Sequence, residues 1–218
     1  MNKKDYTIRL ETANDYRETE NLTREAFWNL NVPGCHEHYF VHILRQQEDF
    51  IPELDFVLEA DGRIIGNVMY TKAKLVDENG TEKQILTMGP ICVHPDYQRK
   101  GYSRILLEHT FKKAVEMGYD TVVNFGNPDN YVARGYKSCK KYNVCFESDV
   151  FPAALLVKEL KEGTLDGRKW FYYPSNSESL CDDVNAVEEF DALFPKKEKA
   201  WQPSQEEFYI HSHSTISW

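Results

Sequence analysis

In the first quarter of the chain, apolar residues occur first at the spacing of a strand and then at the spacing of helices. Alternation predicts a strand over residues 7–10, and apolar positions at helical spacing predict a helix that begins after Asn14 or Asp15. Pro33-Gly34 ends that helix, and a second helix is predicted over residues 37–47. The chain therefore opens in the order strand, helix, helix.

Strand patterns dominate residues 56–93. Two strands flank Asp61-Gly62, a dipeptide typical of tight hairpins, and a second pair flanks residues 77–80, with its second arm over 84–93. A long helix is then predicted from Tyr102 to Met117, and a strand over 121–125. Because strand, long helix and strand form a crossover, we expect the strands at 84–93 and 121–125 to be parallel. The sheet should be mixed.

The pattern weakens toward the C-terminus. We expect a short helix or turn over 127–134, strands over 142–146, 154–160 and 169–173, and a helix from Asp182 or Asp183 to residue 193. The tail from Pro195 has no clear period, although its aromatic residues indicate that it packs on the rest of the chain; these are Trp201, Phe208, Tyr209 and Trp218. We expect one domain over residues 1–150 and a C-terminal extension over 151–218.

Composition and charge narrow the function classes. The 218 residues include 26 Lys and Arg against 35 Asp and Glu, a formal net charge of −9, so nucleic acid is not expected as the primary partner. No apolar run is long enough to span a membrane, and the N-terminus lacks the apolar stretch of a secretory signal, so a cytoplasmic location is expected. Five cysteines without a Cys-x-x-Cys pair indicate reduced thiols.

The most informative segment is a basic turn between the strand at 84–93 and the long helix. Gln98-Arg99-Lys100-Gly101 leads directly into a helix that starts Tyr102-Ser103-Arg104. Backbone N–H groups at a helix N-terminus bind phosphate, Gly101 lets the backbone approach a ligand, and Ser103 is small. The Gly-Lys-Ser/Thr of a Walker loop and the three glycines of a dinucleotide fingerprint are both missing. The turn therefore predicts a pyrophosphate site of another kind.

Two motifs give the chain a family resemblance. Val-x-Pro-x-x-Gln-x-x-Gly-x-small, read as Val93, Pro95, Gln98, Gly101 and Ser103, closely resembles the acetyl-CoA motif of the GNAT superfamily of N-acetyltransferases. Ser103 stands where the family often has Gly or Ala. Tyr131, Gly135 and Tyr136 resemble the family's downstream Tyr-x-x-x-Gly-(Phe/Tyr). The resemblance implies an α/β (α+β) GNAT fold: a mixed, mostly antiparallel twisted sheet with flanking helices and a splayed parallel strand pair.

The resemblance also implies a cosubstrate and roles for individual residues. Acetyl-CoA would place its pyrophosphate on the N–H groups of residues 99–104 and its thioester in the gap between the splayed strands, where Tyr131 would protonate the leaving thiolate. Cys92 is expected to pack in the interior and not to act as a covalent nucleophile. Tyr136 is expected in the core. The expected cofactor-binding residues are Ile91, Cys92, Val93, Gln98, Arg99, Lys100, Gly101, Tyr102, Ser103, Arg104 and Asn127.

On the acceptor side, the segment that joins the first two helices borders the amine in this superfamily. Glu37, His38 and Glu53 could accept the ammonium proton, directly or through water, although each alone could also be an ordinary solvated residue. No metal is expected, because His36 and His38 point apart on a helix. His211 and His213 would share one face of a surface strand, without further evident ligands.

The most specific resemblance is to the bacterial YhbS-like branch of GNAT proteins, over roughly residues 6–173. It is carried by Glu37-His38, Arg45, residues 53–57, Gly89-Pro90, Asn127-Pro128, residues 157–160 and 165–167. Members often have Gly-Asp-Pro where this chain has Gly126-Asn127-Pro128. The tail after Tyr173 has no counterpart, which leaves open a homodimer or a role in acceptor choice.

The leading interpretation is an acetyl-CoA-dependent N-acetyltransferase that acts by direct transfer in a ternary complex, with a cationic amine as acceptor. Two alternatives remain: a non-catalytic acyl-CoA-binding or regulatory module, and a transferase of a longer acyl group.

Overall fold

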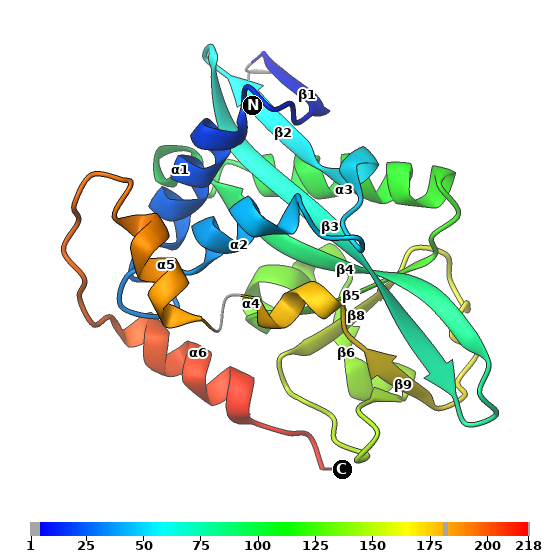
Figure 1. Ribbon diagram of the computed structural model, residues 1–218. Helices are drawn as coiled ribbons and strands as arrows, with labels where there is room; N and C mark the ends of the chain where they lie inside the picture. The colour runs from blue at the N-terminus through cyan, green and yellow to red at the C-terminus, as the bar shows by residue number, and fades with distance from the viewer. Residues whose placement is uncertain (1–4, 181–182, 218) are drawn as a thin grey trace.

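The computed structural model describes residues 5–180 and 183–217, and within them nine strands form one twisted, mixed sheet (Figure 1). The strands are β1 Tyr6–Leu10, β2 Phe56–Ala60, β3 Arg63–Asp77, β4 Glu82–Val93, β5 Thr121–Phe125, β6 Lys137–Ser138, β7 Val144–Cys145, β8 Leu155–Glu159 and β9 Trp170–Tyr173. The helices are α1 Tyr16–Phe27, α2 Glu37–Leu44, α3 Tyr102–Glu116, α4 Pro128–Tyr131, α5 Val184–Asp191 and α6 Pro203–His213. Short 3₁₀ helices are η1 Pro52–Leu54, η2 Pro95–Tyr97, η3 Val132–Arg134, η4 Cys139–Tyr142 and η5 Asn176–Ser179.

The sheet order is β1-β2-β3-β4-β5-β8-β6, with β9 paired to β3 and β7 paired to β9. Neighbours are antiparallel except β4 with β5 and the short β7 with β9. The predicted crossover is therefore confirmed, because α3 connects the parallel strands β4 and β5. The expected boundary at residue 150 falls within this sheet, since β8 pairs with β5 and β9 pairs with β3.

Helices cover both faces of the sheet (Figure 1). On one face, Leu106 and Leu107 of α3 pack against a core cluster that includes Tyr70 and Met88. On the other face, Leu22 of α1 packs with Cys92 of β4, and α2 packs on Met69. Apolar residues on alternate positions of β3 and β4 thus serve two different helix layers, which explains their near-continuous burial.

Several elements differ in length from their sequence patterns. The strand predicted after Asp61-Gly62 and the first arm of the pair around residues 77–80 form one strand that ends at Asp77, because β3 and β4 form a long hairpin arm in which Val76 pairs with Glu82. The helix predicted to reach residue 47 ends at Leu44. The strand expected over 142–146 is reduced to Val144–Cys145, preceded by η4.

The tail contains a helix that no sequence period predicted. Residues 203–213 form α6, and the expectation that His211 and His213 share one face of a strand is wrong, because both lie on this helix. Gln205 is the one buried residue of α6, so the helix has no buried apolar stripe that a helical period could have indicated. Three predictions concern residues outside the described part of the chain: the helix start at Asp182, the packing of Trp218 and the reduced thiol of Cys181.

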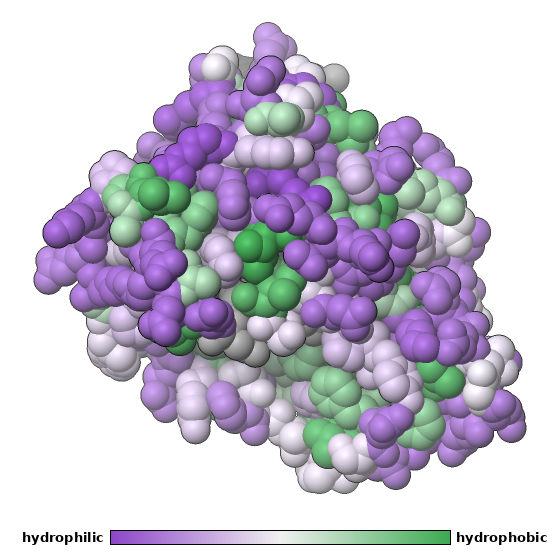
Figure 2. Space-filling model, in the orientation of Figure 1, coloured by the Kyte–Doolittle hydropathy of each residue, from purple (hydrophilic) through white to green (hydrophobic). Residues whose placement is uncertain are grey.

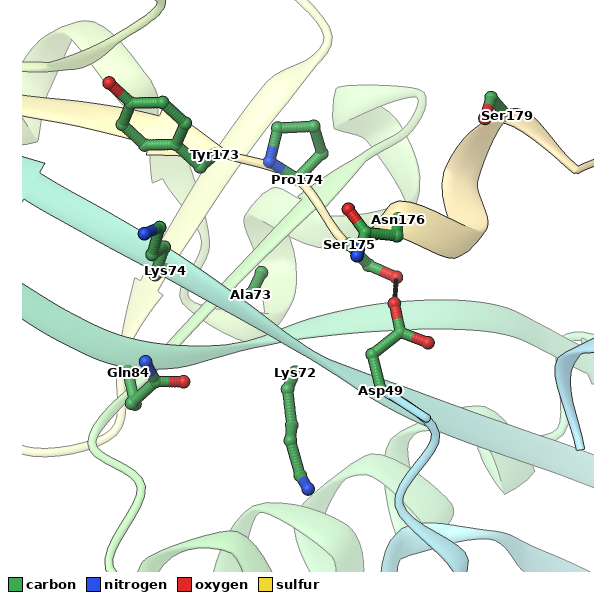
Figure 3. A pocket seen from close by; sticks show the side chains of 10 residues that line it. All are labelled: Asp49, Lys72, Ala73, Lys74, Gln84, Tyr173, Pro174, Ser175, Asn176 and Ser179. Atoms are coloured by element: carbon green, nitrogen blue, oxygen red, sulfur yellow. Dashed lines mark hydrogen bonds between the residues drawn. The ribbon is translucent and has the colours of Figure 1, made fainter. Parts of the chain in front are cut away.

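The C-terminal extension packs over α1 and α2. The Arg24 guanidinium donates to Asp191 of α5 at 2.6 Å, and Lys197 pairs with Glu25 at 2.9 Å. Before α5, Ser175 and Ser177 donate hydroxyl hydrogen bonds to the Asp49 carboxylate, as Figure 3 shows for Ser175. In the described part of the chain, no helix is long and apolar enough to cross a membrane.

Candidate active site

The basic turn that is predicted to bind phosphate, residues 98–101 and here called the phosphate-binding turn, is held in an unusual backbone conformation. Gly101, the N-cap of α3, has φ +89°, and Arg99 also has a positive φ of +59°. Left-handed backbone is costly for residues with a Cβ, so the strain at Arg99 marks this turn as one whose shape matters. A Cβ on Gly101 would meet no atom within 4 Å, so the space beside it is open. The first intrahelical bond runs from the Ile105 N–H to the Gly101 carbonyl, so the N–H groups before Ile105 have no acceptor within the helix.

Some side chains around the turn form hydrogen bonds within it, and others are exposed to solvent. Gln98 Nε2 donates to the Val93 carbonyl at 3.0 Å, which closes the turn onto the end of β4. Lys100 Nζ donates to the Asp96 carbonyl and lies 5.2 Å from the Tyr97 ring centroid. The Arg99 and Lys100 side chains are exposed on the outer side of the turn.

Strands β4 and β5 separate immediately after a short parallel contact. Their register pairs are Leu86 with Val122 and Thr87 with Val123. Beyond these two pairs, β4 continues beside β3 up to Val93 and β5 continues beside β8 up to Phe125, with no further β4–β5 pair among the described residues. Between these diverging segments lies the gap that the family resemblance implied, here called the splayed gap.

Cys92 lies at the β4 side of the splayed gap but faces the α1 layer. Its side chain is buried, and Thr23 Oγ1 lies 3.6 Å from its sulfur. Burial raises the pKa of the Cys92 thiol to about 11, so the thiol stays protonated at neutral pH. The geometry therefore favours packing over a nucleophilic role.

Tyr131 ends the short helix α4, which begins beyond β5. Asn127 caps this helix by accepting a hydrogen bond from the Asp129 N–H at 3.0 Å. The Tyr131 ring packs edge-on against Tyr136, with centroids 5.4 Å apart, and against the α3-side core. Burial raises the pKa of the Tyr131 phenol to about 12, so the phenol is a proton donor throughout the neutral range.

Gly126 makes room for the Tyr131 ring. A Cβ at position 126 would overlap Cε2 of Tyr131 and would lie 3.3 Å from its Cζ. Gly126 was not among the predicted site residues, although its place between β5 and the Asn-Pro start of α4 indicates a close approach of the backbone to another group.

Two buried polar side chains next to the splayed gap also escaped sequence analysis. The Asn124 side chain is 1% exposed, and neither amide atom has a hydrogen-bond partner among the described residues. The buried Tyr136 hydroxyl is likewise without a partner in the described part of the chain. Unpartnered buried polar groups are costly and rare in native proteins, so they are typical of ligand sites. The available signal was a lone amide in the otherwise apolar strand Val122-Val123-Asn124-Phe125.

The two sequence motifs meet through a side-chain contact. Arg134 Nη2 donates to Ser103 Oγ at 2.9 Å, and Arg134 Nη1 donates to the Asn130 carbonyl at 2.7 Å. The first turn of α3 and the segment after Tyr131 are therefore adjacent, although they are about thirty residues apart in the sequence.

The structure places His38 in the interior, away from solvent. Its side chain is fully buried beneath α5, with ring centroids 5.3 Å from those of both Phe190 and Phe194. His38 Nε2 lies 3.2 Å from Asp191 Oδ1, and burial lowers the pKa of the imidazole despite this carboxylate. The extension that covers His38 is more than 140 residues distant in sequence, so no local pattern indicated the burial.

Glu37 and Glu53 lie in different parts of the molecule. Glu37 is half-buried at the first position of α2, where its carboxylate accepts from Asn31 Nδ2 at 2.7 Å and from the His36 N–H at 3.2 Å. Glu53 is exposed in η1. The pKa of Tyr119, which follows the C-terminal end of α3, is raised mainly by burial of its phenol and in addition by the negative charge of Glu53. A helix of 15 residues is roughly 22 Å long, so Glu53 lies well away from the phosphate-binding turn.

A cavity of about 590 Å³ lies elsewhere, between the β3–β4 arm and residues 173–179. Figure 3 shows that Lys72 points away from Asp49 and that Lys74 lies toward Tyr173. Lys74 also pairs with Glu82 at 2.7 Å. The lysines therefore do not converge on one point, and the cavity lies beyond the opposite end of the β4–β5 contact from the splayed gap.

Comparison with known families agrees with this geometry. The family model described as "Acetyltransferase (GNAT) family" matches residues 17–138, which is more than half of the chain. The chain belongs to the acetyltransferase (GNAT) family. Within the GNAT family, it is similar to the uncharacterized N-acetyltransferase YhbS of Escherichia coli (strain K12), with 29% identity over 161 residues, 73% of this chain and 90% of the relative.

Solved GNAT structures share the fold. The crystal structure of Escherichia coli YhbS in complex with CoA superimposes with a TM-score of 0.66 and 24% identity, over 79% of this chain and 91% of that one. A GNAT family acetyltransferase from Brucella melitensis in complex with acetyl-CoA gives a TM-score of 0.60 and 19% identity, over 80% and 98% of the two chains. As a GNAT protein, this chain is an acyltransferase by family.

Proposed function

We propose that the protein is an acetyl-CoA-dependent N-acetyltransferase that acetylates a primary amine by direct attack in a ternary complex. One observation carries the proposal: the strained turn at Arg99 and Gly101 and the Tyr131 segment are joined by the Ser103–Arg134 hydrogen bond at the splayed gap. The bound CoA in the YhbS structure and the acetyl-CoA in the Brucella melitensis structure support the same cosubstrate.

The residues present fit acetyl-CoA. The pyrophosphate would lie on the N–H groups from Arg99 to Arg104, in the open space beside Gly101, with the exposed Arg99 and Lys100 near the outer phosphates. The pantetheine would follow the β4 backbone at residues 91–93, and Asn127 would border it. The unpartnered Asn124 amide would gain a hydrogen-bond partner from the pantetheine or thioester.

Tyr131 would supply the proton that the leaving group needs. The amine nitrogen forms a bond to the acetyl carbonyl carbon, the carbon–sulfur bond breaks, and the thiolate takes the phenolic proton of Tyr131. The pKa of about 12 keeps this proton in place until charge develops on sulfur. Backbone N–H groups at residues 91–93 would polarise the carbonyl.

Among the three carboxylate and imidazole candidates, Glu37 is the best placed to take the ammonium proton. His38 is buried beneath α5, and Glu53 lies near the far end of α3. Glu37 begins α2, directly after the α1–α2 connection, and would attract a cationic amine, which agrees with the net charge of −9. We therefore propose a cationic primary amine as acceptor, with Glu37 as its proton relay.

The proposal is tested by acetyl-CoA binding and by amine-dependent thiol release. A thermal-shift screen with acetyl-CoA and a library of primary amines identifies acceptors, and thiol release then measures turnover. Amine-dependent release with an acetylated product is expected. A protein that binds acetyl-CoA but shows no amine-dependent release would support a non-catalytic acyl-CoA-binding module instead.

The chain offers a matched control for the binding site. Gly101 and Gly118 have φ of +89° and +95°, and a Cβ on either would meet no atom within 4 Å. Gly101→Glu and Gly118→Glu therefore impose similar backbone strain at opposite ends of α3. Gly101→Glu should abolish acetyl-CoA binding, whereas Gly118→Glu should leave the affinity unchanged. Micromolar binding by folded Gly101→Glu would contradict the assignment.

A further inference from the structure

Residues 195–217, here called the strap, are anchored at two separated places. In the first turn of α6, Gln205 Nε2 donates to the Asn29 carbonyl at 3.0 Å, and Ser204 Oγ donates to the Leu30 carbonyl at 2.8 Å. At its end, the Ala153 N–H donates to the Ser214 carbonyl at 2.8 Å. Helix α6 forms the middle of the strap and crosses the lower part of the view in Figure 1.

The two anchors lie on opposite sides of the splayed gap. The first is the connection after α1, whose last residue, Phe27, packs in the cluster that contains Cys92 of β4. The second precedes β8, which pairs with β5, and the Gly126 N–H donates to the Ala154 carbonyl at 3.0 Å. Eleven helical residues span roughly 16 Å. The strap therefore reaches from the β4 side of the gap to the β5 side, on the sheet face that carries α1 and α2.

The two faces of α6 differ in exposure. At 100° per residue, Phe208 falls at the centre of the face that also carries the buried Gln205 and the partly buried His211. Ile210 and His213 fall on the opposite face. Phe208 is 38% exposed against 53% for Ile210, so the face with Phe208 and His211 is the less exposed of the two, and both side chains remain accessible to a ligand.

The β5 side of the gap is also aromatic and accessible. Phe125, the last residue of β5, is 41% exposed and stacks on Phe146 with ring centroids 6.1 Å apart. Figure 2 shows hydrophobic residues at the centre of this face, between α2 and α4, and again beside the C-terminal end of α6. Hydrophilic side chains surround both patches. An acceptor that enters here would meet apolar surface next to the reacting carbon.

We propose that the strap closes the acceptor site and selects a primary amine with an aromatic or other apolar body. Phe208 contacts that body, and His211 accepts a hydrogen bond from the amine. The inference rests on the proposed acetyl transfer, because it names the acceptor of that same site. The strap lies beyond residues 17–138, where the family model matches, so acceptor choice is assigned to a part of this chain outside the matched region.

The test uses the full chain, acetyl-CoA, and two probe amines, 2-phenylethylamine and ethylamine. Wild type should prefer 2-phenylethylamine in kcat/KM. Phe208→Ala should lower kcat/KM for 2-phenylethylamine by roughly 10-fold, change it little for ethylamine, and leave the KM of acetyl-CoA unchanged. Ile210→Ala is the matched control on the opposite face and should change neither amine. In the same way, His211→Ala should raise the amine KM several-fold, and His213→Ala should not.

The experiment distinguishes a wrong proposal about the strap from a wrong proposed function. If wild type acetylates both amines and the inward and outward variants behave alike, the strap proposal is overturned and the acetyl transfer stands. If wild type releases no thiol with any amine, the proposed function is overturned. Hydrogen exchange then tests whether the strap binds the amine. With CoA and saturating 2-phenylethylamine, slower exchange in residues 206–213 than with CoA alone supports the strap as a binding element, and unchanged exchange overturns it.

Discussion

Arg134 donates a hydrogen bond from Nη2 to Ser103 Oγ at 2.9 Å, and thereby joins the segment after Tyr131 to the first turn of α3. Ser103 is the small residue of the phosphate-binding motif, and Tyr131 is the proposed acid. A serine at this position therefore does more than leave room for a pyrophosphate, because it fixes the distance between the two halves of the site.

A double-mutant cycle measures this connection. Ser103→Ala and Arg134→Ala each remove one partner, and the free energy of unfolding should show a coupling of about 1 kcal/mol, the typical net contribution of an intramolecular hydrogen bond. The measurement is chemical denaturation of the wild type, both single variants and the double variant. Strictly additive losses would show that the contact does not hold the two segments together.

Gly126→Ala should damage catalysis through the Tyr131 ring. The backbone at Gly126 is not left-handed, so the added Cβ acts through its overlap with Cε2 of Tyr131. We expect a loss of roughly 1–3 kcal/mol in stability, as for other overpacked sites, together with a lower kcat. In a Tyr131→Ala background the same substitution should cost almost no stability. An equal cost in both backgrounds would locate the strain elsewhere.

Stability should depend on pH through Asp55. This carboxyl is buried, accepts from Asn67 Nδ2 at 3.0 Å, and has its pKa raised by burial and by the neighbouring Glu11 carboxylate. A group whose pKa is raised on folding stabilises the protein fully below its unfolded value of about 3.9, and this contribution is lost as the pH rises. Asp55→Asn should therefore flatten the decline in stability between about pH 5 and pH 8. An unchanged pH profile in urea denaturation would contradict a protonated Asp55.

Glu37→Gln should lower kcat/KM more for strongly basic amines than for weakly basic ones. Only the neutral amine attacks, so amines with a high pKa depend most on a proton relay, and their kcat/KM should fall more than that of weakly basic amines. The wild-type rate should rise with pH as the amine and relay lose their protons. Because burial raises the pKa of Tyr131 to about 12, its deprotonation should cause no decline below about pH 11. Equal losses for both classes of amine, or a preferred anionic acceptor, would contradict the role of Glu37.

Sequence patterns predicted the parts of the fold that local periodicity determines. The long amphipathic helix α3, the Asp61-Gly62 hairpin and the parallel β4–β5 pair were all indicated by spacing and turn residues. The turn before α3 was equally visible as a structural feature, because a backbone with positive φ at the N-cap of a helix favours glycine, which stands there as Gly101.

The missed features depend on contacts between distant segments. His38 is buried by Phe190 and Phe194 of the C-terminal extension, which no pattern around residue 38 could indicate. Helix α6 buries little apolar surface and is held at both ends by hydrogen bonds, so its sequence lacks an amphipathic period. The Asn124 amide stands out once its strand is known to border the splayed gap, where the surrounding apolar residues leave it unpartnered among the described residues.

The central claim is that Tyr131 protonates the leaving thiolate at the splayed gap, and the most direct measurement is the single-turnover rate of Tyr131→Phe with saturating acetyl-CoA and amine. The variant keeps the ring that packs on Tyr136 and loses the proton. The rate should fall by roughly 100-fold with nearly unchanged acetyl-CoA affinity, whereas Tyr70→Phe, which removes a buried hydroxyl paired with Thr110 at 2.9 Å, should slow the reaction little. Full turnover by Tyr131→Phe, under conditions where chemistry limits the rate, would contradict the account.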